Sequence, residues 1–335
     1  MTKNKVLNFF MTSFNGMAIG LFSTLIISVI ISQISKLIGG IPNLEVIETG
    51  LLNLSSILKS SMGIGIGFGI AIALKLDGIK LVVIGISGGI ATWLYYDPMV
   101  AYLTTVSVYF VLIYLLKRKT PVDIIIVPLI GTIFAYVVAS LIGLPVKTGM
   151  EYLGDFIQYA TSLQPFIMGI VIAVLMGIFL TMPISSAAIA IAISMGGIAG
   201  GAAVVGGSVQ MIGFAIMSRK DNNIGTVLSI AIGTSMLQFK NILKKPIIWL
   251  PTIIVSAILG PISTLVFKTE TVPNGAGMGT SGFVGQFGTI EAMGTTTNAL
   301  LSIVLLHIVF PIILVLAIDM YMRKKNIIKI GDLKI

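Results

Sequence analysis

The sequence predicts an all-α polytopic membrane protein, and its composition is the main reason. Of the 335 residues, 56% are hydrophobic and only 10% are charged, and the mean hydropathy is +1.07. A helix needs about 20 apolar residues to cross a bilayer, and runs near that length recur along the chain. Because lipid cannot hydrogen-bond to free backbone groups, such runs form helices. We therefore expect about ten transmembrane helices in a single membrane domain, residues 1–335.

The predicted spans begin and end where charged residues interrupt the apolar sequence. A basic N-terminal stretch, MTKNKVLNFFMTSFNG, leads into the first span, and no small-residue cleavage site follows it, so we expect an anchor helix there. Two further apolar stretches, residues 223–239 and 272–296, are interrupted and are predicted to be re-entrant. The ten predicted spans are residues 14–36, 56–74, 79–96, 99–116, 122–143, 164–182, 184–203, 205–218, 246–267 and 298–322.

The distribution of basic residues indicates the orientation. Short cytoplasmic loops of membrane proteins collect Lys and Arg. With both termini in the cytoplasm, all of the 21 Lys and Arg residues lie in predicted cytoplasmic segments except Lys36, Lys59, Lys147 and Lys268. The sequence therefore predicts a multi-pass protein of the cell membrane whose termini are both cytoplasmic.

The same rule constrains the first interrupted stretch. A full crossing by residues 223–239 would place the basic cluster at 240–245 on the opposite side from Arg219. A dip that returns to the cytoplasm keeps both basic groups on one side. The net charge of +9 is then explained by anionic lipid at the cytoplasmic face of the bilayer, and no nucleic-acid partner is expected.

Two pairs of stretches indicate an internal repeat. MGIGIGFGIAIALKLDGIKLVVIGISGGIA, residues 62–91, resembles MGIVIAVLMGIFLTMPISSAAIAIAISMGGIA, residues 168–199. LLKRKTPVDIIIVP likewise resembles ILKKPIIWLP, and both pairs run the same way through the predicted membrane. We therefore predict parallel repeats over 62–145 and 168–267, with a binding site between them. A chance likeness of apolar, glycine-rich helices is the alternative.

The stretch VPNGAGMGTSGFVGQFG, residues 272–288, is the least suited to a helix facing lipid. It carries six glycines and one proline. Glycine is entropically costly in helices, and lipid leaves free backbone groups unsatisfied. The stretch is therefore either an external loop or a broken segment buried in protein. Its lack of charge favours the broken segment, and transporters bind polar solutes on such segments.

Polar residues at predicted membrane depth are the candidate solute-binding residues. Ser208 and Gln210 follow GGIAGGAAVVGG, a run of small residues typical of helix packing. Gln210 pairs either with a neighbouring helix or with a solute. In MPISSAA, Ser185 and Ser186 either cap a helix or mark one whose free N–H groups face an anion. Gln238 faces either the cavity or the solvated cytoplasmic boundary.

The glycine-rich stretch and the span after it hold the remaining candidates. Hydroxyls and amides suit sugar hydroxyls, whereas successive glycine N–H groups can form an anion-binding nest. Ionisable residues in membrane segments are functional candidates by default, which adds Glu291 and His307. Glu291 lies either at the site or in the outer interface, and His307 is either a proton carrier or a hydrogen-bonded interior residue. The candidates from the stretch itself are Asn274, Thr280, Ser281 and Gln286.

The residue types exclude several kinds of chemistry. The chain has no cysteine, so disulfides, thiol chemistry and cysteine metal sites are excluded, and its one histidine leaves little scope for a zinc cage. Neither a metal nor another cofactor is expected. No plausible pairing of a nucleophile with a base is present, which counts against an intramembrane hydrolase.

Four stretches carry a resemblance to a known family. MPISSAAIAI, GGIAGGAAVVGGSVQMIGFA, GTSMLQFKNILKKPIIWLP and PNGAGMGTSGFVGQ resemble the membrane-protein family that groups phosphotransferase-system enzyme IIC proteins with PfoR-type regulators of toxin expression. The likeness covers nearly the whole chain and is densest over residues 180–290. It implies a dimeric membrane subunit that carries a sugar and hands it to separate IIB and IIA proteins. Their phosphorelay needs a phosphorylated cysteine or histidine on a soluble domain, so we expect no self-contained phosphotransferase here.

Two functions follow from the resemblance, and both stay open. A translocator of the enzyme IIC kind would hold a carbohydrate while one half of the protein rocks against the other. A PfoR-like sensor would bind its solute without transport and pass a signal to a cytoplasmic partner. Uptake or exchange of solute in vesicles separates the two functions. The predicted ligands of the translocated carbohydrate are Gln210, Thr280, Ser281, Gln286, Glu291 and His307.

Overall fold

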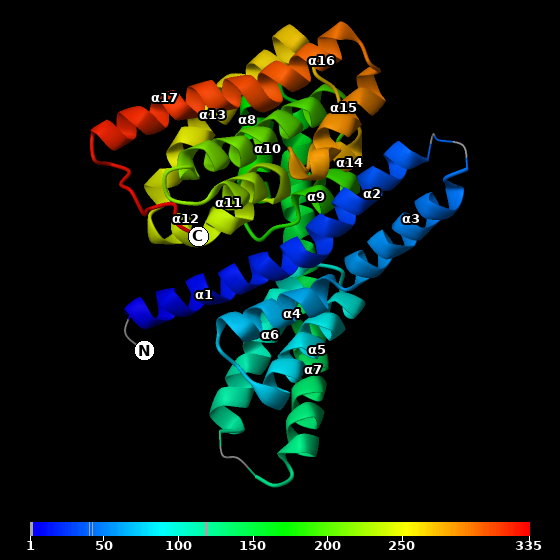
Figure 1. Cartoon of the computed structure of the whole chain (residues 1–335), viewed down its shortest axis with the longest axis vertical. Coiled ribbons are helices and arrows are strands. Elements are labelled where there is room, and N and C mark those ends of the chain that lie inside the picture. Colours follow the sequence, from blue (N-terminus) through cyan, green and yellow to red (C-terminus); the bar gives the residue numbers. More distant parts are fainter. Residues whose placement is uncertain (1–2, 40, 42, 118–119) are drawn as a thin grey trace. The chain divides into compact units, whose positions relative to one another are not determined.

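The computed structural model is helical in most of the residues that it describes. Within those residues no strand forms, and the isolated antiparallel bridge joins Gly197 to Thr271. The all-α prediction is confirmed. The chain divides into two compact units, residues 1–149 and 150–335 (Figure 1). The described residues are 3–39, 41, 43–117 and 120–335.

The first unit consists of helices that approach one another closely at glycines. Its α-helices are α1 (Lys3–Leu21), α2 (Ile27–Ile38), α3 (Glu45–Ser60), α4 (Met62–Ala73), α5 (Gly78–Leu94), α6 (Pro98–Phe110) and the greater part of α7 (Asp123–Thr161), with π turns at Phe22–Ile26 and Val111–Leu115. A β-carbon on Gly20 of α1 would lie 2.2 Å from the carbonyl oxygen of Gly65 in α4. One on Gly88 of α5 would lie 2.0 Å from the carbonyl oxygen of Gly63 in α4. Only glycine permits such close approach of two helix backbones.

The second unit consists of helices of which several are short or interrupted. Its α-helices after α7 are α8 (Pro165–Thr181), α9 (Ser186–Ala192), α10 (Gly197–Ser218), α11 (Ile224–Leu228), α12 (Phe239–Lys244), α13 (Leu250–Ile262), α14 (Pro273–Ala276), α15 (Val284–Met293), α16 (Thr297–Val304) and α17 (Phe310–Lys324). Turns of 3-10 or π helix join or extend them at Ser229–Gly233, Ser235–Gln238, Pro246–Trp249, Ser263–Phe267, Ser281–Phe283 and Leu305–Val309.

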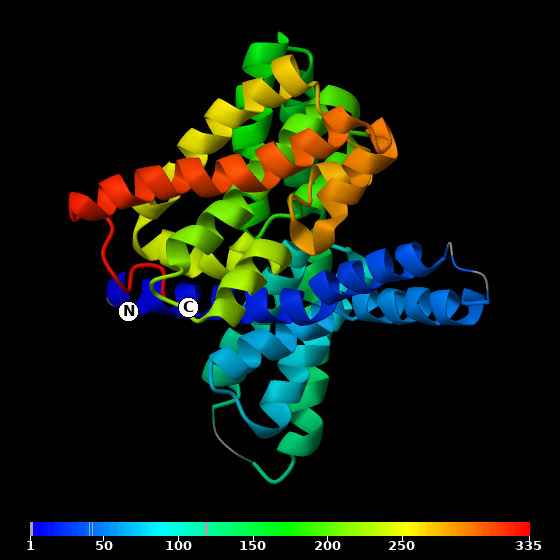
Figure 2. The same ribbon diagram turned by 45° about the horizontal axis from the view of Figure 1, so that its top comes forward.

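Helices α8, α10 and α13 pack against one another in the second unit (Figure 2). A β-carbon on Gly206 of α10 would lie 1.9 Å from the carbonyl oxygen of Ala173 in α8. Further along both helices, Thr181 of α8 reaches Gln210 of α10. Because the contact advances toward later residues in both helices, α8 and α10 run parallel. Residues 182–196 must therefore return along α8, whose 17 residues span about 25 Å.

The prediction of two separate spans over 184–203 and 205–218 is wrong. The structure has one continuous helix there, α10, and before it only the seven-residue α9. The glycines and alanines of α10 are buried against its neighbours, and this packing keeps the backbone helical through residue 204. Pro183 lies between α8 and α9, where its ring cannot continue a helix.

The number of full-length spans is smaller than the ten predicted. Helices α3 and α4 meet at a bend of 53°, and counted together they would form one further span. Helices α5 and α8, predicted as spans 79–96 and 164–182, are apolar but only 17 residues long. Among the described residues, six helical stretches are long and apolar enough to cross a membrane: Asn8–Lys36, Pro98–Leu115, Asp123–Thr161, Gly197–Ser218, Pro246–Phe267 and Thr297–Lys324.

Residues 224–244, which we call the first broken segment, contain no continuous long helix. The π turn Ser229–Gly233 ends at Thr234, whose φ of −160° and ψ of 138° are those of an extended strand. The side chain of Thr234 then caps the next 3-10 turn by accepting from the N–H of Met236. The segment therefore has a backbone break at residues 233–235.

Residues 272–293, the second broken segment, double back on themselves. A β-carbon on Gly275 would lie 3.2 Å from the Cα of Gly288, so the two limbs of the segment touch near its ends. Between them, Gly279 and Gly282 both have a φ of 52°, which other residues rarely adopt. The segment therefore turns back at 279–283. Glycine supplies the backbone conformations for that turn.

Candidate functional site

The two broken segments meet at their breaks, and hydroxyl groups of the second bind backbone carbonyls of the first. Thr280 Oγ1 donates to the carbonyl oxygen of Ala231 at 2.5 Å. Ser281 Oγ donates to the carbonyl oxygen of Gly233 at 2.7 Å, and both hydroxyl-bearing residues are buried. These carbonyls lie at the end of a helical turn, where no later N–H of the same helix can reach them. We call this contact the junction.

Helix α10 packs against the second broken segment at the junction. A β-carbon on Gly279 would lie 2.5 Å from the carbonyl carbon of Gly207, so the tip of the second broken segment touches the α10 backbone. The next residue of α10, Ser208, is fully buried, and its Oγ has no hydrogen-bond partner among the described residues. Leaving a buried polar group unpaired costs on the order of 1–3 kcal/mol. Ser208 is therefore a place where a bound solute would gain a hydrogen bond.

Gln210 of α10 is the centre of a buried polar cluster. Its Oε1 accepts from Trp249 Nε1 and from Thr252 Oγ1, both at 2.9 Å. Thr181 Oγ1 lies 3.4 Å from the same oxygen and 2.9 Å from Ser235 Oγ. Since Ser235 belongs to the first broken segment, the cluster is continuous with the junction. The Nε2 of Gln210 is buried and lacks a partner in the described part of the chain.

Gln286 and His307 form a second buried polar pair. The Nε2 of Gln286, on α15, lies 3.0 Å from Nδ1 of His307, which is in the π turn Leu305–Val309. His307 is fully buried, and the turn that carries it packs against α10. Within the described residues, neither the Oε1 of Gln286 nor the Nε2 of His307 has a hydrogen-bond partner. The pair therefore has unused hydrogen-bonding capacity inside the protein.

Of the nine candidate residues predicted from the sequence, six lie at the junction or in the polar groups around α10, and three do not. Asn274 and Glu291 are exposed, near the two ends of the second broken segment. Gln238 is buried, but its Nε2 donates to the carbonyl oxygen of Leu333 and its Oε1 accepts from Asn241. The assignment of all nine residues to a solute stays a prediction.

Ser186 has a third role besides the two expected for it. Its Oγ donates to the carbonyl oxygen of Gly277 at 2.7 Å, so it ties the start of α9 to the second broken segment. A β-carbon on Gly277 would lie 2.5 Å from the backbone nitrogen of Ala187, which makes this contact as close as the one at Gly279. The interrupted region between α8 and α10 therefore supports the second broken segment.

Sequence reasoning missed four members of the Gln210 cluster. Thr181, Trp249 and Thr252 are single polar residues in apolar surroundings, and Ser235 follows another hydroxyl, that of Thr234; such hydroxyls commonly bond to nearby backbone of their own segment. Thr252 does make such a bond, to the carbonyl oxygen of Trp249, in addition to its bond to Gln210. No local signal distinguishes these residues, because their shared partner comes from another helix.

The polar side chains of the junction, of the Gln210 cluster and of the pair of Gln286 and His307 are neutral hydroxyls, amides, an indole and an imidazole. Across the described residues, no group of three or more His, Cys, Asp or Glu is placed to hold a metal ion. Buried ions are normally matched by charged side chains. The arrangement therefore suits a neutral solute that is rich in hydrogen-bonding groups.

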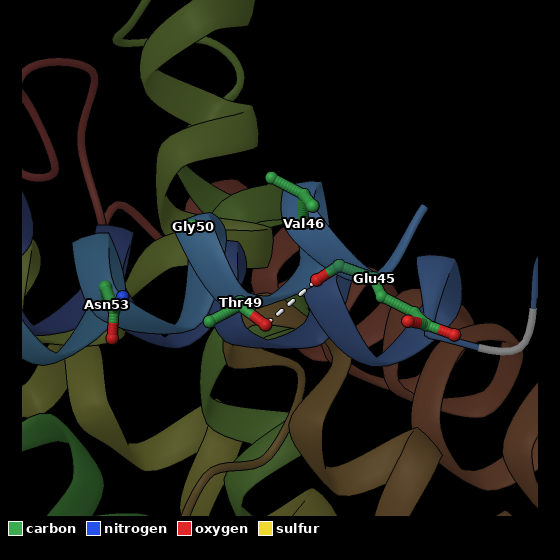
Figure 3. Close-up of a pocket in the computed structure, with 5 residues that line it drawn as sticks. All are labelled: Glu45, Val46, Thr49, Gly50 and Asn53. Atoms are coloured by element: carbon green, nitrogen blue, oxygen red, sulfur yellow. Dashed lines mark hydrogen bonds between the residues drawn. The ribbon is translucent and has the colours of Figure 1, made fainter. Parts of the chain in front are cut away.

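A shallow hollow on the first unit contains none of these residues (Figure 3). All five lining residues belong to α3, and within that helix Thr49 Oγ1 donates to the carbonyl oxygen of Glu45 at 2.9 Å. The hollow therefore contributes nothing to the candidate site. It measures about 430 Å³ and is lined by Glu45, Val46, Thr49, Gly50 and Asn53.

Comparison with known proteins identifies the chain at the level of its family. A family model described as "Phosphotransferase system, EIIC" matches residues 11–335, which is nearly the whole chain. Searches of curated proteins and of solved structures returned no match. That family in general implies a carbohydrate substrate and cytoplasmic IIA and IIB partners. This chain is therefore a multi-pass membrane component of the transporter type that belongs to the phosphotransferase system EIIC family.

Proposed function

We propose that the chain binds a small polar solute, a carbohydrate, at the junction of the two broken segments and carries it across the membrane. The main support is a set of buried polar atoms without partners among the described residues, and native interiors contain few such atoms. The set lies on α10 or on elements that pack against it. A solute with several hydroxyls would offer hydrogen-bond partners to these atoms, which are Ser208 Oγ, Gln210 Nε2, Gln286 Oε1 and His307 Nε2. Six other buried polar atoms of the described residues also lack a partner and are not assigned to the site.

The pair of Gln286 and His307 indicates a hydroxyl as the group that it binds. If Gln286 Nε2 donates to Nδ1, then the imidazole proton is on Nε2 and the amide oxygen is a free acceptor. If the amide is turned round, Nδ1 donates to the amide oxygen, and a free amide N–H stands beside a free imidazole acceptor. Both arrangements leave one donor and one acceptor. A sugar hydroxyl donates and accepts, whereas a phosphate dianion or a carboxylate only accepts.

The breaks in the backbone provide a way for the solute to enter and leave. The bonds from Thr280 to Ala231 and from Ser281 to Gly233 join segments almost 50 residues apart, and each can be exchanged for a bond to a solute hydroxyl. Non-helical backbone at membrane depth is tolerated where it lines a cavity. We infer that both broken segments are re-entrant, the first from the cytoplasm and the second from the opposite side.

Cysteine labelling tests this orientation, since the chain has no native cysteine. Lys244→Cys, at an exposed position that ends the first broken segment, should react with a membrane-impermeant maleimide from the cytoplasmic side only. Glu291→Cys, exposed near the end of the second, should react from the outer side only. Lys334→Cys should react from the cytoplasmic side. Labelling of Lys244→Cys and Glu291→Cys from the same side would contradict the opposed arrangement.

Phosphorylation of the sugar would be the work of separate IIB and IIA proteins. The chain has no cysteine, and its one histidine is buried beside Gln286, out of reach of a cytoplasmic phosphoryl donor. Basic side chains at the end of the first broken segment, including Lys240 and Lys244, would face those proteins in the proposed orientation. The role of this chain is then to bind the sugar and present it.

A thermal-shift screen of the purified protein against neutral sugars and sugar phosphates tests the solute class, because a ligand of the folded state raises its Tm. We expect a neutral sugar to raise the Tm, and the shift to disappear in Gln286→Ala and in His307→Ala. Thr289→Val is the matched control, since that buried hydroxyl bonds only within α15. A shift that survives both substitutions, or a larger shift with a sugar phosphate, would contradict the proposal.

Exchange of a labelled sugar in proteoliposomes separates transport from sensing. Exchange that depends on Gln286 supports translocation. Binding without exchange would instead favour a PfoR-like sensor that uses the same site. We also expect the chain to form a homodimer, as the family resemblance implies, and cross-linking in native membranes tests that expectation.

A further inference from the structure

Residues 326–335 leave the end of α17 and pack back onto the second unit. We call them the strap. Ile328 and Leu333 are 1% and 0% exposed and belong to the main hydrophobic core, together with Met322 of α17 and Ile242 of α12. Figures 1 and 2 both place the end of this red segment beside the first broken segment. A segment with two side chains in the core is a docked element of the fold.

Side-chain amides of the first broken segment and its approach bind the backbone of the strap. The carbonyl oxygen of Leu333 accepts from Asn222 Nδ2 at 2.8 Å and from Gln238 Nε2 at 2.9 Å. Asn241 Nδ2 donates to the carbonyl oxygen of Lys334 at 3.1 Å. Asn222 precedes the break at residues 233–235, whereas Gln238 and Asn241 follow it. The strap therefore holds the first broken segment on both sides of its break, through Asn222 just before the segment and through Gln238 and Asn241 in its second limb.

Polar contacts of Asp332 and its neighbours hold the strap at the same place. Asp332 forms an ion pair with Lys245 at 2.5 Å and accepts from the backbone N–H of Lys329 at 2.7 Å. Partial burial opposes ionisation of Asp332, but these two hydrogen bonds, together with the positive charges of Lys245 and Arg323, outweigh it and lower its pKa. The backbone N–H of Gly331 donates to Asp221 at 2.6 Å. The carboxylate is therefore ionised and paired at neutral pH.

The strap is connected through one short stretch of chain to the junction. Gln238, which it binds, lies three residues after Ser235 of the Gln210 cluster and five after Gly233, whose carbonyl accepts from Ser281. When the first broken segment is held on both sides of its break, the carbonyls at its tip stay in place for Thr280 and Ser281. Movement of the tip away from α10 requires that at least one side be released.

We propose that the strap controls access to the junction from the cytoplasm. Docked, it keeps the first broken segment closed over α10. Released, it lets the tip at residues 231–235 move and opens the buried polar groups. This regulation rests on the proposed function for its consequence, because the solute site is the one that the tip covers. The movement of the tip itself does not depend on which solute binds, or on whether one binds.

Thiol labelling measures the movement directly. Ser235→Cys introduces a fully buried reporter into a chain without cysteine, and a membrane-impermeant maleimide reaches it only when the tip opens. We expect Asp332→Asn combined with Leu333→Ser to raise the labelling rate at least tenfold. Lys334→Gln, an exposed substitution in the same strap, is the matched control and should leave the rate unchanged.

A second reporter separates opening of the tip from general loosening of the fold. Ser302→Cys lies in α16, is fully buried and replaces a hydroxyl that bonds only to Ala299 in the same helix. Its labelling rate should not respond to the strap substitutions. An equal rise at both reporters, or no rise at Ser235→Cys, would overturn the proposal. Because labelling needs no solute, either result leaves the test of the proposed function untouched.

A reversible lock gives the complementary measurement. Lys245→Cys with Asp332→Cys places one thiol at the end of α12 and one on the strap, at the two positions that an ion pair now joins. Cysteine is shorter than lysine, so a bifunctional maleimide with an internal disulfide is used to join the two thiols. Cross-linking should lower sugar exchange in proteoliposomes at least tenfold, and a reductant should restore it. Exchange that is the same in the cross-linked and reduced states would overturn the proposal. If no exchange occurs even in the unsubstituted chain, the proposed function has failed, and the labelling rates alone decide the role of the strap.

Discussion

The two units pack their helices through glycine in the same way, but they differ in the kind of backbone that their buried hydroxyls reach. In the first unit, Ser87 Oγ donates to the carbonyl oxygen of Val83 in its own helix, and Ser55 Oγ donates to that of Ser28 in the continuous helix α2. In the second, Ser281 Oγ donates to the carbonyl oxygen of Gly233, 48 residues away in another segment. A bond within one helix persists wherever that helix moves. A bond between two broken segments can be exchanged, which is why the proposed solute site lies in the second unit.

The sequence likeness between the units makes this difference more informative. The predicted repeats, 62–145 and 168–267, begin with the uninterrupted helices α4 and α8. After α4 the chain forms the 17-residue α5, whereas after α8 it passes Pro183 and forms only the seven-residue α9. The repeat itself stays a prediction. Similar apolar sequences thus lead to a continuous helix in one unit and to an interrupted connection in the other.

The largest effect is expected from a side chain at the tip of the second broken segment. Gly279→Val would force a β-branched residue to a φ of 52° and into the backbone of Gly207. Strain and overpacking together should cost about 3 kcal/mol or more of unfolding free energy and abolish sugar binding. Gly50→Ala is the control in the first unit, since a β-carbon there meets nothing within 4 Å. It should raise stability by about 0.5–1 kcal/mol, as measured by denaturant unfolding.

The second effect compares the two kinds of buried hydroxyl directly. Ser281→Ala leaves the carbonyl of Gly233 without this partner and should cost about 1–3 kcal/mol. Sugar affinity, measured by titration calorimetry, should fall at least tenfold. Ser87→Ala should cost less than about 1 kcal/mol, because the carbonyl of Val83 keeps its helical partner. Equal losses of affinity in both variants would refute the distinction between the units.

The third effect concerns the Gln210 cluster. Gln210→Met preserves most of the side-chain volume but leaves the indole N–H of Trp249 unpaired, which should cost about 1–2 kcal/mol. Sugar affinity should also fall, since the unpartnered Nε2 of Gln210 is removed. The Tm and the sugar-induced shift report these two losses separately. An unchanged shift at a lowered Tm would give Gln210 a structural role alone.

The smallest effect is the pH dependence of the strap. Because the pKa of Asp332 is lowered from 3.8 in the folded state, its ionisation stabilises the fold above that value. The stabilisation is lost as the pH falls through the lower, folded-state pKa, where Asp332→Asn becomes equivalent to the unsubstituted chain. For a partly exposed pair the difference should be under about 1 kcal/mol. Tm values of both proteins between pH 3 and 7 should differ above pH 5 and converge in acid; divergence in acid would reverse the assigned sign.

Much of the candidate site could be predicted because its residues break local rules. Thr280, Ser281 and Gln286 stand in a glycine-rich stretch between apolar segments, which composition alone identifies. His307 is an ionisable residue within an apolar helix. Thr181 and Ser235 could not be predicted in this way, because a hydroxyl has the same local sequence pattern whether it bonds to its own turn or to another helix.

The predicted boundary between two spans near residue 204 shows a different limit of prediction from sequence. The run GGIAGGAAVVGG reads as a weak helix by propensity, since glycine is unfavourable there by about 1 kcal/mol for each residue. In the structure the run belongs to a deeply buried helix, because the absence of side chains lets α8, residues 269–271 and the second broken segment approach its backbone. Propensity describes an isolated helix, and here the neighbouring helices override it.

By itself, the sequence determined that this is an all-α membrane protein of the enzyme IIC kind and where its backbone cannot remain helical. Apolar length, glycine and proline act within a few residues, so these properties are local. Only the tertiary structure decided that Thr280 and Ser281 meet Ala231 and Gly233, and that residues 326–335 fasten the segment carrying those carbonyls. Hydrogen bonds between such distant residues depend on the path of the chain, which local sequence pattern does not contain.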